Sequence, residues 1–347
     1  MDKIIITGAN GFIGSHLIDL CISNGYEVYG LERPDQIYKN LSHYTFDKEM
    51  FSKEEKQECL GELISIPTNN KRLVILECDV KNALLLEKII RKIKPKFIFH
   101  FAAQPYILQS WEDPVGTIEV NVIGTINVFQ PLIKYKLETR VILACTSTEY
   151  DTKNRSGVPL KETDPLLALH PYGISKIAAE LLARQYFSNF NVEIINLRFF
   201  NQTGIRRIND APSDFIRKLI KIELGLDGNK LQVGNLNPYR DFTDIKDSVL
   251  AILLAATNGK PGETYNVCSG KKVQIREILN IVLSFSNEKI EVVENDPQKL
   301  RKVDEDIIIG DNSKIKIELG WEPTLSIEET LKEMYFYWLN YYKRQKL

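Results

Sequence analysis

Residues 3–14 read KIIITGANGFIG, a run of β-branched residues that breaks into glycines at Gly8, Gly11 and Gly14. The next stretch, SHLIDLCISNG, has the apolar spacing of an amphipathic helix. A strand, a glycine-rich turn and a helix in this order are typical of a dinucleotide-binding unit, because the turn lets the backbone approach a pyrophosphate. The N-terminus of the helix then faces the anion. We therefore expect a phosphate-binding turn at the end of the first strand.

An acidic residue closes the second apolar run, YEVYGLE. Glu32 lies 18 positions after Gly14, where a carboxylate suits an adenosine ribose with a free 2′-hydroxyl and repels a 2′-phosphate. NAD is therefore the favoured cofactor. Arg33 follows directly, and a guanidinium can hold a 2′-phosphate, so NADP stays possible.

The composition is that of a soluble globular protein with no general attraction for polyanions. Of 347 residues, 44% are apolar, and 45 Lys and Arg balance 46 Asp and Glu. This balance predicts no nucleic-acid or membrane partner. The five cysteines are scattered without CxxC spacing, and strand one begins at Lys3, which leaves no room for a signal peptide. We expect a cytoplasmic protein with reduced thiols. The four histidines have no metal-ligand spacing, so no metal is expected.

Apolar strand-like runs alternate with helical patterns along the first two hundred residues. The runs lie at 3–7, 26–31, 73–76, 97–101, 140–145 and 193–198, and the helical patterns at 82–93, 116–135 and 174–188. This alternation predicts an α/β fold with a Rossmann-type, doubly wound parallel sheet. Residues 33–72 interrupt it with few aliphatic side chains, which indicates a surface insertion with short helices.

The organisation predicts two domains. Residues 1–200 should form the dinucleotide-binding domain, and residues 201–347 a smaller α/β substrate-binding lobe, with some chain returning to the first domain. In the second part we expect a helix at 213–224 and a final helix at 326–343 with aromatic residues along one face. Ligands of open α/β sheets bind at the C-terminal ends of the strands.

Tyr172 and Lys176 stand four residues apart in the segment HPYGISK. This spacing places both on one side of a helix, and a nearby ammonium favours the ionised phenol. Upstream, the strand VILAC runs into Thr146, which puts a hydroxyl at the tip of a strand. These three residues are candidates for acid–base chemistry beside the cofactor.

The ordered motifs resemble those of extended short-chain dehydrogenase/reductases that act on nucleotide sugars. The motifs are GANGFIG, Asp79, HFAAQ at 100–104, NVIGT at 121–125, TSTEY at 146–150, YGISK at 172–176 and RFFNQTG at 198–204. The resemblance spans nearly the whole chain. It implies that Thr146 holds the reacting oxygen, that Tyr172 exchanges its proton, and that Lys176 holds the nicotinamide ribose and keeps the tyrosine acidic.

The same resemblance implies the residues that bind the cofactor. They are Gly8, Asn10, Gly11, Phe12, Ile13, Gly14, Glu32, Arg33, Asp79, Val80, Ala102, Ala103, Gln104, Asn121, Tyr172 and Lys176. Asp79 and Val80 would lie beside the adenine, and residues 102–104 beside the central part of the cofactor. The family also forms homodimers through a four-helix bundle, here built from helices near 116–135 and 174–188.

The second half resembles GDP-4-keto-6-deoxy-D-mannose reductases first and GDP-mannose 4,6-dehydratases next, on the segments SDFIRKLIKIELG, VGNLNPYRDFTDIKD and YNVCSGKKVQIREIL. This implies a nucleotide-diphosphate sugar as substrate. The implied contacts with the diphosphate or base come from Asn201, Lys218, Arg240 and Arg301, and the other substrate-binding residues are Ser147, Thr148, Val233 and Asn235. A guanidinium fork such as that of Arg240 is a natural partner for a diphosphate.

The reaction type depends on position 148. A 4,6-dehydratase needs a carboxylate to move the C5 proton and release the C6 hydroxyl. In the family that this chain resembles, that glutamate lies two places after the catalytic Ser/Thr, and this chain has Thr148 there. Glu149 is adjacent but should face away, because successive residues of an extended segment point to opposite sides. The favoured function is therefore reduction of a GDP-linked 4-keto-6-deoxyhexose. A 4-epimerase with retained NAD, a dehydratase and a non-catalytic binding protein remain as alternatives.

Overall fold

The computed structural model describes residues 1–34, 37–44, 65–67, 70, 72–152, 157–299 and 306–345. The chain divides into two compact units. Unit 1 comprises Met1–Tyr150, Pro165–Arg198 and Val249–Tyr265, and unit 2 comprises Asp151–Asp164, Phe199–Ser248 and Asn266–Leu347. Among the helices of these described ranges, none combines the length and the apolar character that crossing a bilayer requires.

Unit 1 is built on one eight-stranded sheet with the order β11-β7-β6-β5-β1-β2-β4-β3. Strand β1 pairs in parallel with β2 and β5, β2 with β4, and β5 with β6, whereas the edge strand β3 runs antiparallel to β4. The strands are β1 Lys3–Thr7, β2 Glu27–Glu32, β3 Ser65–Pro67, β4 Leu73–Glu77, β5 Phe97–His100, β6 Arg140–Thr146, β7 Ile194–Phe199 and β11 Thr264–Val267. The predicted doubly wound sheet is confirmed.

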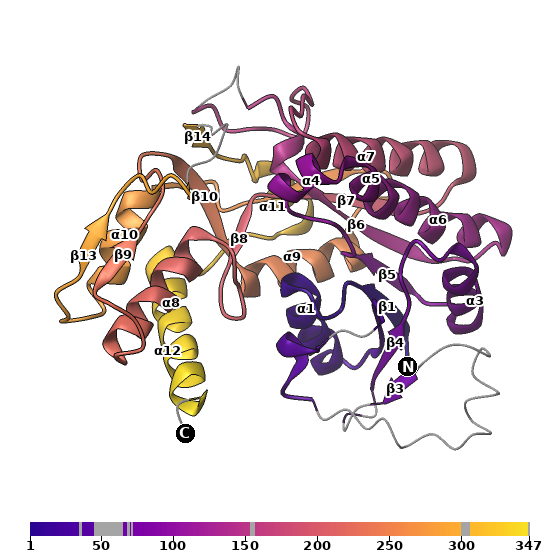
Figure 1. Ribbon diagram of the computed structural model, residues 1–347. Coiled ribbons are helices and arrows are strands. Elements are labelled where there is room, and N and C mark those ends of the chain that lie inside the picture. Colours follow the sequence, from indigo (N-terminus) through magenta and orange to yellow (C-terminus); the bar gives the residue numbers. More distant parts are fainter. Residues whose placement is uncertain are drawn as a thin grey trace. The chain divides into compact units, whose positions relative to one another are not determined.

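Helices cover both faces of this sheet. Helices α3, α6 and α7 lie over one face, and α1 and α9 over the other (Figure 1). The helices and helical turns of this part of the chain are α1 Phe12–Ser23, η1 Lys39–Leu41, α3 Ala83–Ile93, α4 Ile107–Glu112, α5 Pro114–Ile118, η2 Glu119–Ile123, α6 Gly124–Lys134, η3 Ser147–Glu149, α7 Pro171–Phe190 and α9 Ile245–Asn258. Because both faces are covered, the strands read as continuous apolar runs and are recognisable from sequence.

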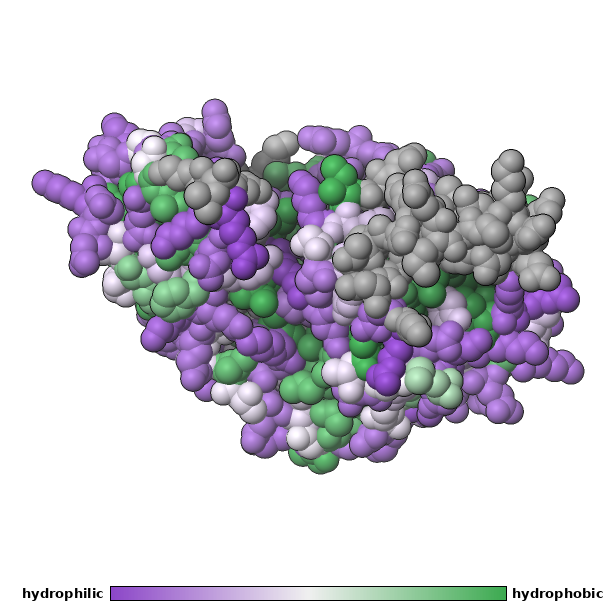
Figure 2. All heavy atoms as spheres, turned by 90° about the horizontal axis from the view of Figure 1, so that it is seen from below, coloured by the Kyte–Doolittle hydropathy of each residue, from purple (hydrophilic) through white to green (hydrophobic). Residues whose placement is uncertain are grey.

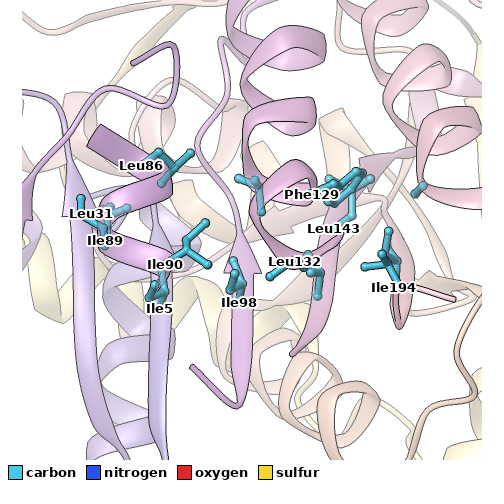
Figure 3. Close-up of a cluster of buried hydrophobic side chains, with 14 of the residues drawn as sticks. Ile5, Leu31, Leu86, Ile89, Ile90, Ile98, Phe129, Leu132, Leu143 and Ile194 are labelled. Carbon is cyan, nitrogen blue, oxygen red and sulfur yellow. The ribbon is translucent and has the colours of Figure 1, made fainter. Parts of the chain in front are cut away.

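A hydrophobic core of unit 1 lies between the sheet and the helices α3 and α6. Ile5, Ile98 and Leu143 point from their strands toward these helices (Figure 3). Leu86, Ile89 and Ile90 of α3 and Phe129 and Leu132 of α6 meet them from above. The burial of these side chains holds the crossover helices against the sheet, which in turn places the loops at the ends of the strands.

The helix expected at 116–135 is a composite. Residues 114–118 form α5, residues 119–123 form the π-helical turn η2, and residues 124–134 form α6. An apolar spacing cannot distinguish these forms, since a single π-turn displaces the helical repeat by one residue only. Asn121 lies in this turn and is buried.

The insertion predicted at 33–72 falls largely outside the described residues. Its described parts are the one-turn helix η1 and the edge strand β3. The expectation of short helices therefore holds for η1 and is wrong for residues 65–67, which extend the sheet by pairing with β4.

His100 lies at the end of β5 and is hydrogen-bonded to β1, where the order of the strands in the sheet reverses. The Oγ1 atom of Thr7 accepts the backbone N–H groups of Phe101 at 3.1 Å and Ala102 at 3.0 Å, and lies 2.8 Å from Nδ1 of His100. Since both lone pairs of the hydroxyl accept hydrogen bonds, the hydroxyl donates its own hydrogen bond to Nδ1 of His100. His100 is therefore neutral and carries its own proton on Nε2.

The opposite ring nitrogen of His100 continues the chain of hydrogen bonds. Its Nε2 lies 3.1 Å from Oγ1 of Thr125, which donates to the Asn121 carbonyl at 2.7 Å. Burial first, and the charge of Lys176 second, lower the pKa of His100 to about 3. The histidine joins β1, β5 and α6 as a neutral group.

Unit 2 holds a smaller sheet in the order β12-β10-β14, with β8 also paired to β10, and a two-stranded sheet of β9 and β13. These strands are β8 Asn201–Thr203, β9 Lys230–Gln232, β10 Tyr239–Asp244, β12 Lys272–Gln274, β13 Glu291–Val293 and β14 Ile307–Ile308. The helices are α8 Ala211–Glu223, α10 Ile275–Leu283, α11 Ser313–Leu319 and α12 Ile327–Gln345. The predicted helices at 213–224 and 326–343 correspond to α8 and α12.

The aromatic residues of α12 are not confined to one face. Trp338 and Tyr342 pack into the core of unit 2 with α8 and α10, whereas Phe336 and Tyr341 are exposed. The expectation of a single aromatic face was wrong, because six aromatic residues between 335 and 342 exceed what one face of a helix accommodates.

Hydrophilic residues dominate the face of the molecule drawn in Figure 2, with hydrophobic residues in smaller groups between them. This agrees with the ordinary apolar fraction and balanced charge of the chain.

We predict that His100 makes stability depend on pH below neutrality. The unfolded histidine titrates near its ordinary value of 6.5, while the folded one stays neutral to about 3. The unfolded state therefore binds more protons in this window, so the contribution is complete above pH 6.5 and is lost as the pH falls toward 3. Between pH 7 and 5 the free energy of unfolding should drop by about 2 kcal/mol more in the wild type than in His100→Gln.

Urea unfolding followed by circular dichroism measures this difference. His43→Gln, at an exposed histidine, is the matched control and should keep the wild-type dependence. Equal pH dependence in the wild type and His100→Gln would show that folding does not lower the pKa of His100.

Candidate functional site

The predicted phosphate-binding turn is as tight as the glycines require. Gly8 has φ of +70°, and a Cβ atom on it would come within 2.9 Å of the Ala102 nitrogen. A Cβ atom on Gly14 would lie 2.3 Å from the Gly8 carbonyl oxygen. Helix α1 begins with Gly11 as its N-cap, with no side-chain cap and no acidic residue in its first turn. This N-terminus therefore presents backbone N–H groups and a positive dipole end, which suit a diphosphate.

Glu32 closes the turn from the end of β2. Its Oε2 accepts the N–H of Asn10 at 3.0 Å and its Oε1 accepts the N–H of Arg33 at 3.1 Å. Asn10 in turn donates to the Ile37 carbonyl, and Asn40 donates to the side chain and the carbonyl of Asn10. The carboxylate is thus held in place, and each of its oxygens keeps acceptor capacity for a ribose hydroxyl.

The segments that follow β4 and β5 end at the same edge of the sheet. After β4, Asp79 accepts the N–H of Lys81 at 2.9 Å, and Val80 is buried. After β5, Gln104 exchanges backbone hydrogen bonds with the amide of Asn121, at 2.8 and 3.1 Å. Residues 101–104 are partly exposed. These positions agree with a ligand lying along the C-terminal ends of parallel strands.

Asn121 connects this loop to helix α7. Its Nδ2 donates to Oγ of Ser175 at 2.9 Å, and Ser175 donates to the Tyr172 carbonyl at 2.6 Å. A buried amide with partners on two sides fixes both. The structure therefore gives Asn121 a definite positioning role for Gln104 and for the first turn of α7.

Tyr172 lies in the first turn of α7. The helix begins at Pro171, and the His170 side chain caps it by accepting the Gly173 N–H at 2.9 Å. The rings of His170 and Tyr172 are stacked with centroids 6.0 Å apart. One turn further, Lys176 is 5% exposed and donates from Nζ to the Ala144 carbonyl at 2.9 Å. Burial lowers the pKa of Lys176. Lys176 thus ties α7 to β6, two residues before Thr146.

Thr146 ends β6 and caps the one-turn helix η3. Its Oγ1 accepts the Thr148 N–H and lies 3.3 Å from Oγ1 of Thr148. The Glu149 carboxyl turns back and accepts the Thr146 N–H at 2.8 Å. This reciprocal pair is a capping box.

Glu149 is 0% exposed, and its carboxylate is bonded to the Thr146 N–H at the end of β6. The expected orientation of Glu149 away from the reacting groups stays a prediction. The local geometry differs from the expected one, because the segment is helical instead of extended. The capping bond, and not the alternation of a strand, directs the carboxylate inward. Ser147 is buried and Thr148 partly exposed at the same turn.

The predicted substrate residues of unit 2 have varied surroundings. Asn201 donates to the Asp241 carbonyl at 3.2 Å. Arg240 is 5% exposed, and its guanidinium donates to the carbonyl of the preceding residue, Tyr239. Lys218 pairs with Asp227.

Two further residues that were predicted to bind the substrate lie before β10, and a third lies outside the described residues. The Val233 side chain is buried in the core of unit 2, and the Asn235 side chain accepts the Asn237 N–H at 3.1 Å. Arg301 lies outside the described residues.

A buried ion pair behind the Thr146 turn was missed by sequence reasoning. Arg198 of β7 donates from Nε and Nη2 to the two oxygens of Glu180 on α7, at 2.8 and 2.6 Å. Although burial opposes it, the Arg198 hydrogen bonds and charge lower the pKa of Glu180 to about 2. Two signals in the sequence pointed to this pair. Glu180 repeats the four-residue spacing of Tyr172 and Lys176, and Arg198 interrupts an apolar strand.

The comparisons with known proteins agree with this fold. The family model described as GDP-mannose 4,6 dehydratase matches residues 5–334. A GDP-6-deoxy-D-mannose reductase of Pseudomonas aeruginosa is 25% identical over 337 residues, which cover 97% of each chain.

Two solved structures share the fold over nearly their whole length. The structure of RMD from Pseudomonas aeruginosa complexed with NADPH has a TM-score of 0.79 at 22% identity and covers 98% of this chain and 100% of that one. The UDP-glucuronic acid 4-epimerase of Bacillus cereus, in complex with UDP-glucuronic acid and NAD, has a TM-score of 0.80 at 25% identity, with the same coverage.

Proposed function

Because the chain belongs to the GDP-mannose 4,6 dehydratase family, we propose that it is an NAD(P)-dependent enzyme that reduces the C4 keto group of a GDP-linked 4-keto-6-deoxyhexose. The observation that carries this proposal is the turn at the tip of β6. Thr148 stands where elimination requires a carboxylate, and Glu149 is buried and bonded to Thr146. The turn therefore offers hydroxyl groups, which can hold a keto oxygen but cannot move a C5 proton.

The residues of unit 1 fit the cofactor. The tight glycine turn and the N-terminus of α1 suit its diphosphate, and Glu32 suits a ribose with a free 2′-hydroxyl. We assign NAD as the preferred cofactor, with NADP possible through Arg33. When bound, the nicotinamide supplies the hydride.

The reduction then asks three things of the chain's own side chains. Thr146 donates a hydrogen bond to the C4 oxygen, and Tyr172 transfers its phenolic proton to that oxygen as the carbonyl is reduced. Lys176, fixed by the Ala144 carbonyl, holds positive charge near the phenol. We propose that Asn201, Lys218, Arg240 and Arg301 contact the diphosphate or the base of the nucleotide.

A 4-epimerase is the second candidate. The carboxylate of Glu32 favours NAD, which a 4-epimerase retains while it oxidises C4 and reduces the opposite face of the keto sugar. An epimerase with NAD also shares the fold. It differs from a reductase in returning an isomer of the substrate.

We also propose a homodimer. Apolar side chains are exposed along the outer sides of α4, α5, η2 and α7, namely Leu108, Trp111, Val115, Ile118, Ile123, Ile174 and Leu181. Val115 is 68% and Leu181 54% exposed. An apolar face this extended marks an interaction surface, and two copies of it would form a four-helix bundle. The described cysteines are buried free thiols, which supports a cytoplasmic location.

Tyr172→Phe should lower kcat by about a hundredfold or more, because it removes the proton donor. The fold and the affinity for NADH should remain nearly unchanged. Steady-state turnover with a GDP-4-keto-6-deoxyhexose tests this. Tyr135→Phe is the control, because Tyr135 caps the C-terminus of α6, away from the C-terminal ends of the strands. A Tyr172→Phe enzyme with more than a tenth of wild-type kcat would exclude Tyr172 as the donor.

Product analysis decides the reaction type. With the GDP-4-keto-6-deoxyhexose and NADH, mass spectrometry should find a sugar heavier by two hydrogens, formed faster than with NADPH. GDP-mannose with NAD should yield no product lighter by one water. A dehydrated product would overturn the reductase proposal, and an isomer of unchanged mass would favour the epimerase.

Leu181→Glu should convert the dimer into a monomer, because it places a charge in the apolar contact. Analytical ultracentrifugation measures the change. The control is Ile317→Glu on α11, whose side chain is 81% exposed but lies outside this face. A wild-type chain that sediments as a monomer at micromolar concentration would contradict the proposed dimer.

A further inference from the structure

The interior behind the Thr146 turn holds two carboxyl groups for one buried arginine. Glu149 and Glu180 are both 0% exposed, and Arg198 is 1% exposed. Arg198 gives both of its short hydrogen bonds to Glu180, and its Nε is 3.9 Å from Oε2 of Glu149. Arg184 also donates to Glu180, at 2.6 Å. Among the described residues, the ion pairs of Arg198 and Arg184 with Glu180 are therefore short, whereas the ion pair of Arg198 with Glu149 is long.

One oxygen of Glu149 lacks a donor. Oε1 accepts the Thr146 N–H, whereas Oε2 is buried and has no hydrogen-bond partner among the residues that the structure describes. A carboxylate oxygen of Glu149, a carboxylate oxygen of Glu180 and the Cys145 sulfur all lie within 4.8 Å of one another. A bare carboxylate oxygen in such a place is costly, but a protonated one can donate to a neighbouring carboxylate. The geometry thus calls for a proton on Oε2.

The other titratable and charged groups around Glu149 leave this conclusion intact. Lys176 of α7 is engaged by the Ala144 carbonyl, and Tyr150 lies with its ring 4.7 Å from the Arg198 guanidinium. Burial raises the pKa of the Cys145 thiol well above its usual range, so this group is neutral. Burial, and next the charge of Glu180, likewise raise the pKa of Glu149 well above its usual range.

We propose that Glu149 is a positioning residue that keeps a proton at neutral pH and holds the Thr146 turn in its reactive geometry through the bond between its carboxyl and the Thr146 N–H. The proton bridges Glu149 to Glu180, and the Arg198 pair anchors both to β7 and α7. Loss of the proton would place a second negative charge beside Glu180 and push the turn out of place. The role of the turn in turnover rests on the proposed function, whereas the proton on Glu149 does not.

The first test needs no substrate. A native state that keeps a proton which the unfolded chain has lost is favoured at low pH, and this advantage falls as the pH rises toward the folded pKa. Glu149→Gln carries the same two hydrogen bonds without a titrating proton. Urea unfolding should therefore show the folding constant of Glu149→Gln gaining on the wild type by about tenfold per pH unit from pH 6 to 8. Glu328→Gln, at an exposed glutamate, should show no such gain.

The second test measures turnover. Glu149→Ala should lower kcat by about tenfold or more with KM changed less than about threefold, because a misplaced turn impairs the chemical step more than binding. Glu149→Gln should rescue kcat and move the alkaline limit of the kcat profile to higher pH. If Glu149→Ala does not fold, the Gln variant and its two pH dependences decide the proposal.

Each outcome separates the two proposals. If the ratio of the folding constants of Glu149→Gln and the wild type does not change with pH, Glu149 is ionised in the folded state, and the proposal that it keeps a proton is wrong. Full kcat in a folded Glu149→Ala overturns the positioning role. A wild-type chain that reduces no GDP-4-keto sugar overturns the proposed function alone, and the unfolding comparison then still decides whether Glu149 keeps its proton.

Discussion

The buried pair of Arg198 and Glu180 is the constraint around which the reactive part of unit 1 is arranged. An arginine that is 1% exposed must find a full set of acceptors, because an uncompensated buried charge costs several kcal/mol. Glu180 accepts two of its N–H groups, one on each oxygen, and this ties α7 to β7. Tyr172 and Lys176 lie on the same helix, two turns and one turn before Glu180. The ion pair therefore also fixes the position of Tyr172 and Lys176 relative to the sheet.

The edge of the sheet where β1 and β5 end is held by a neutral network. Thr7, His100 and Thr125 form a chain of hydrogen bonds that all donate in one direction. The loop after β5 is held by the Thr7 hydroxyl and by Asn121. Each of these groups is buried and has its partners within the fold. A charged pair and a neutral chain thus stabilise neighbouring parts of one site. Both contributions are lost as the pH falls, because the pKa of Glu180 and that of His100 are lowered in the folded state.

Much of the fold could be predicted from sequence because its signals are local. The strands of a covered parallel sheet are short β-branched runs, and their bounds in the structure differ from the expected ones by one residue or so. The glycine turn and the spacing of Tyr172 and Lys176 are equally local. The Glu180–Arg198 pair joins residues 18 apart on different elements, and Glu149 reaches its place through a capping box. Glu180 and Arg198 stand out in the sequence, the first by its spacing and the second by its charge within an apolar strand, but only the fold shows that they pair. Thr146 and Glu149 have the spacing of a capping box, but the segment was expected to be extended.

The π-turn at Glu119–Ile123 has a consequence for how this chain tolerates change in length. The turn holds one more residue than an α-helical turn would, and Asn121 inside it reaches both Gln104 and Ser175. Deleting a single residue here would restore a regular helix and keep α6 nearly in phase with α5, because five residues of a π-turn and four residues of an α-helix turn the chain through about the same angle. The deletion would, however, remove the wide turn from which Asn121 reaches both of its partners. The extra residue therefore adds a buried polar contact without changing the faces that the flanking helices present.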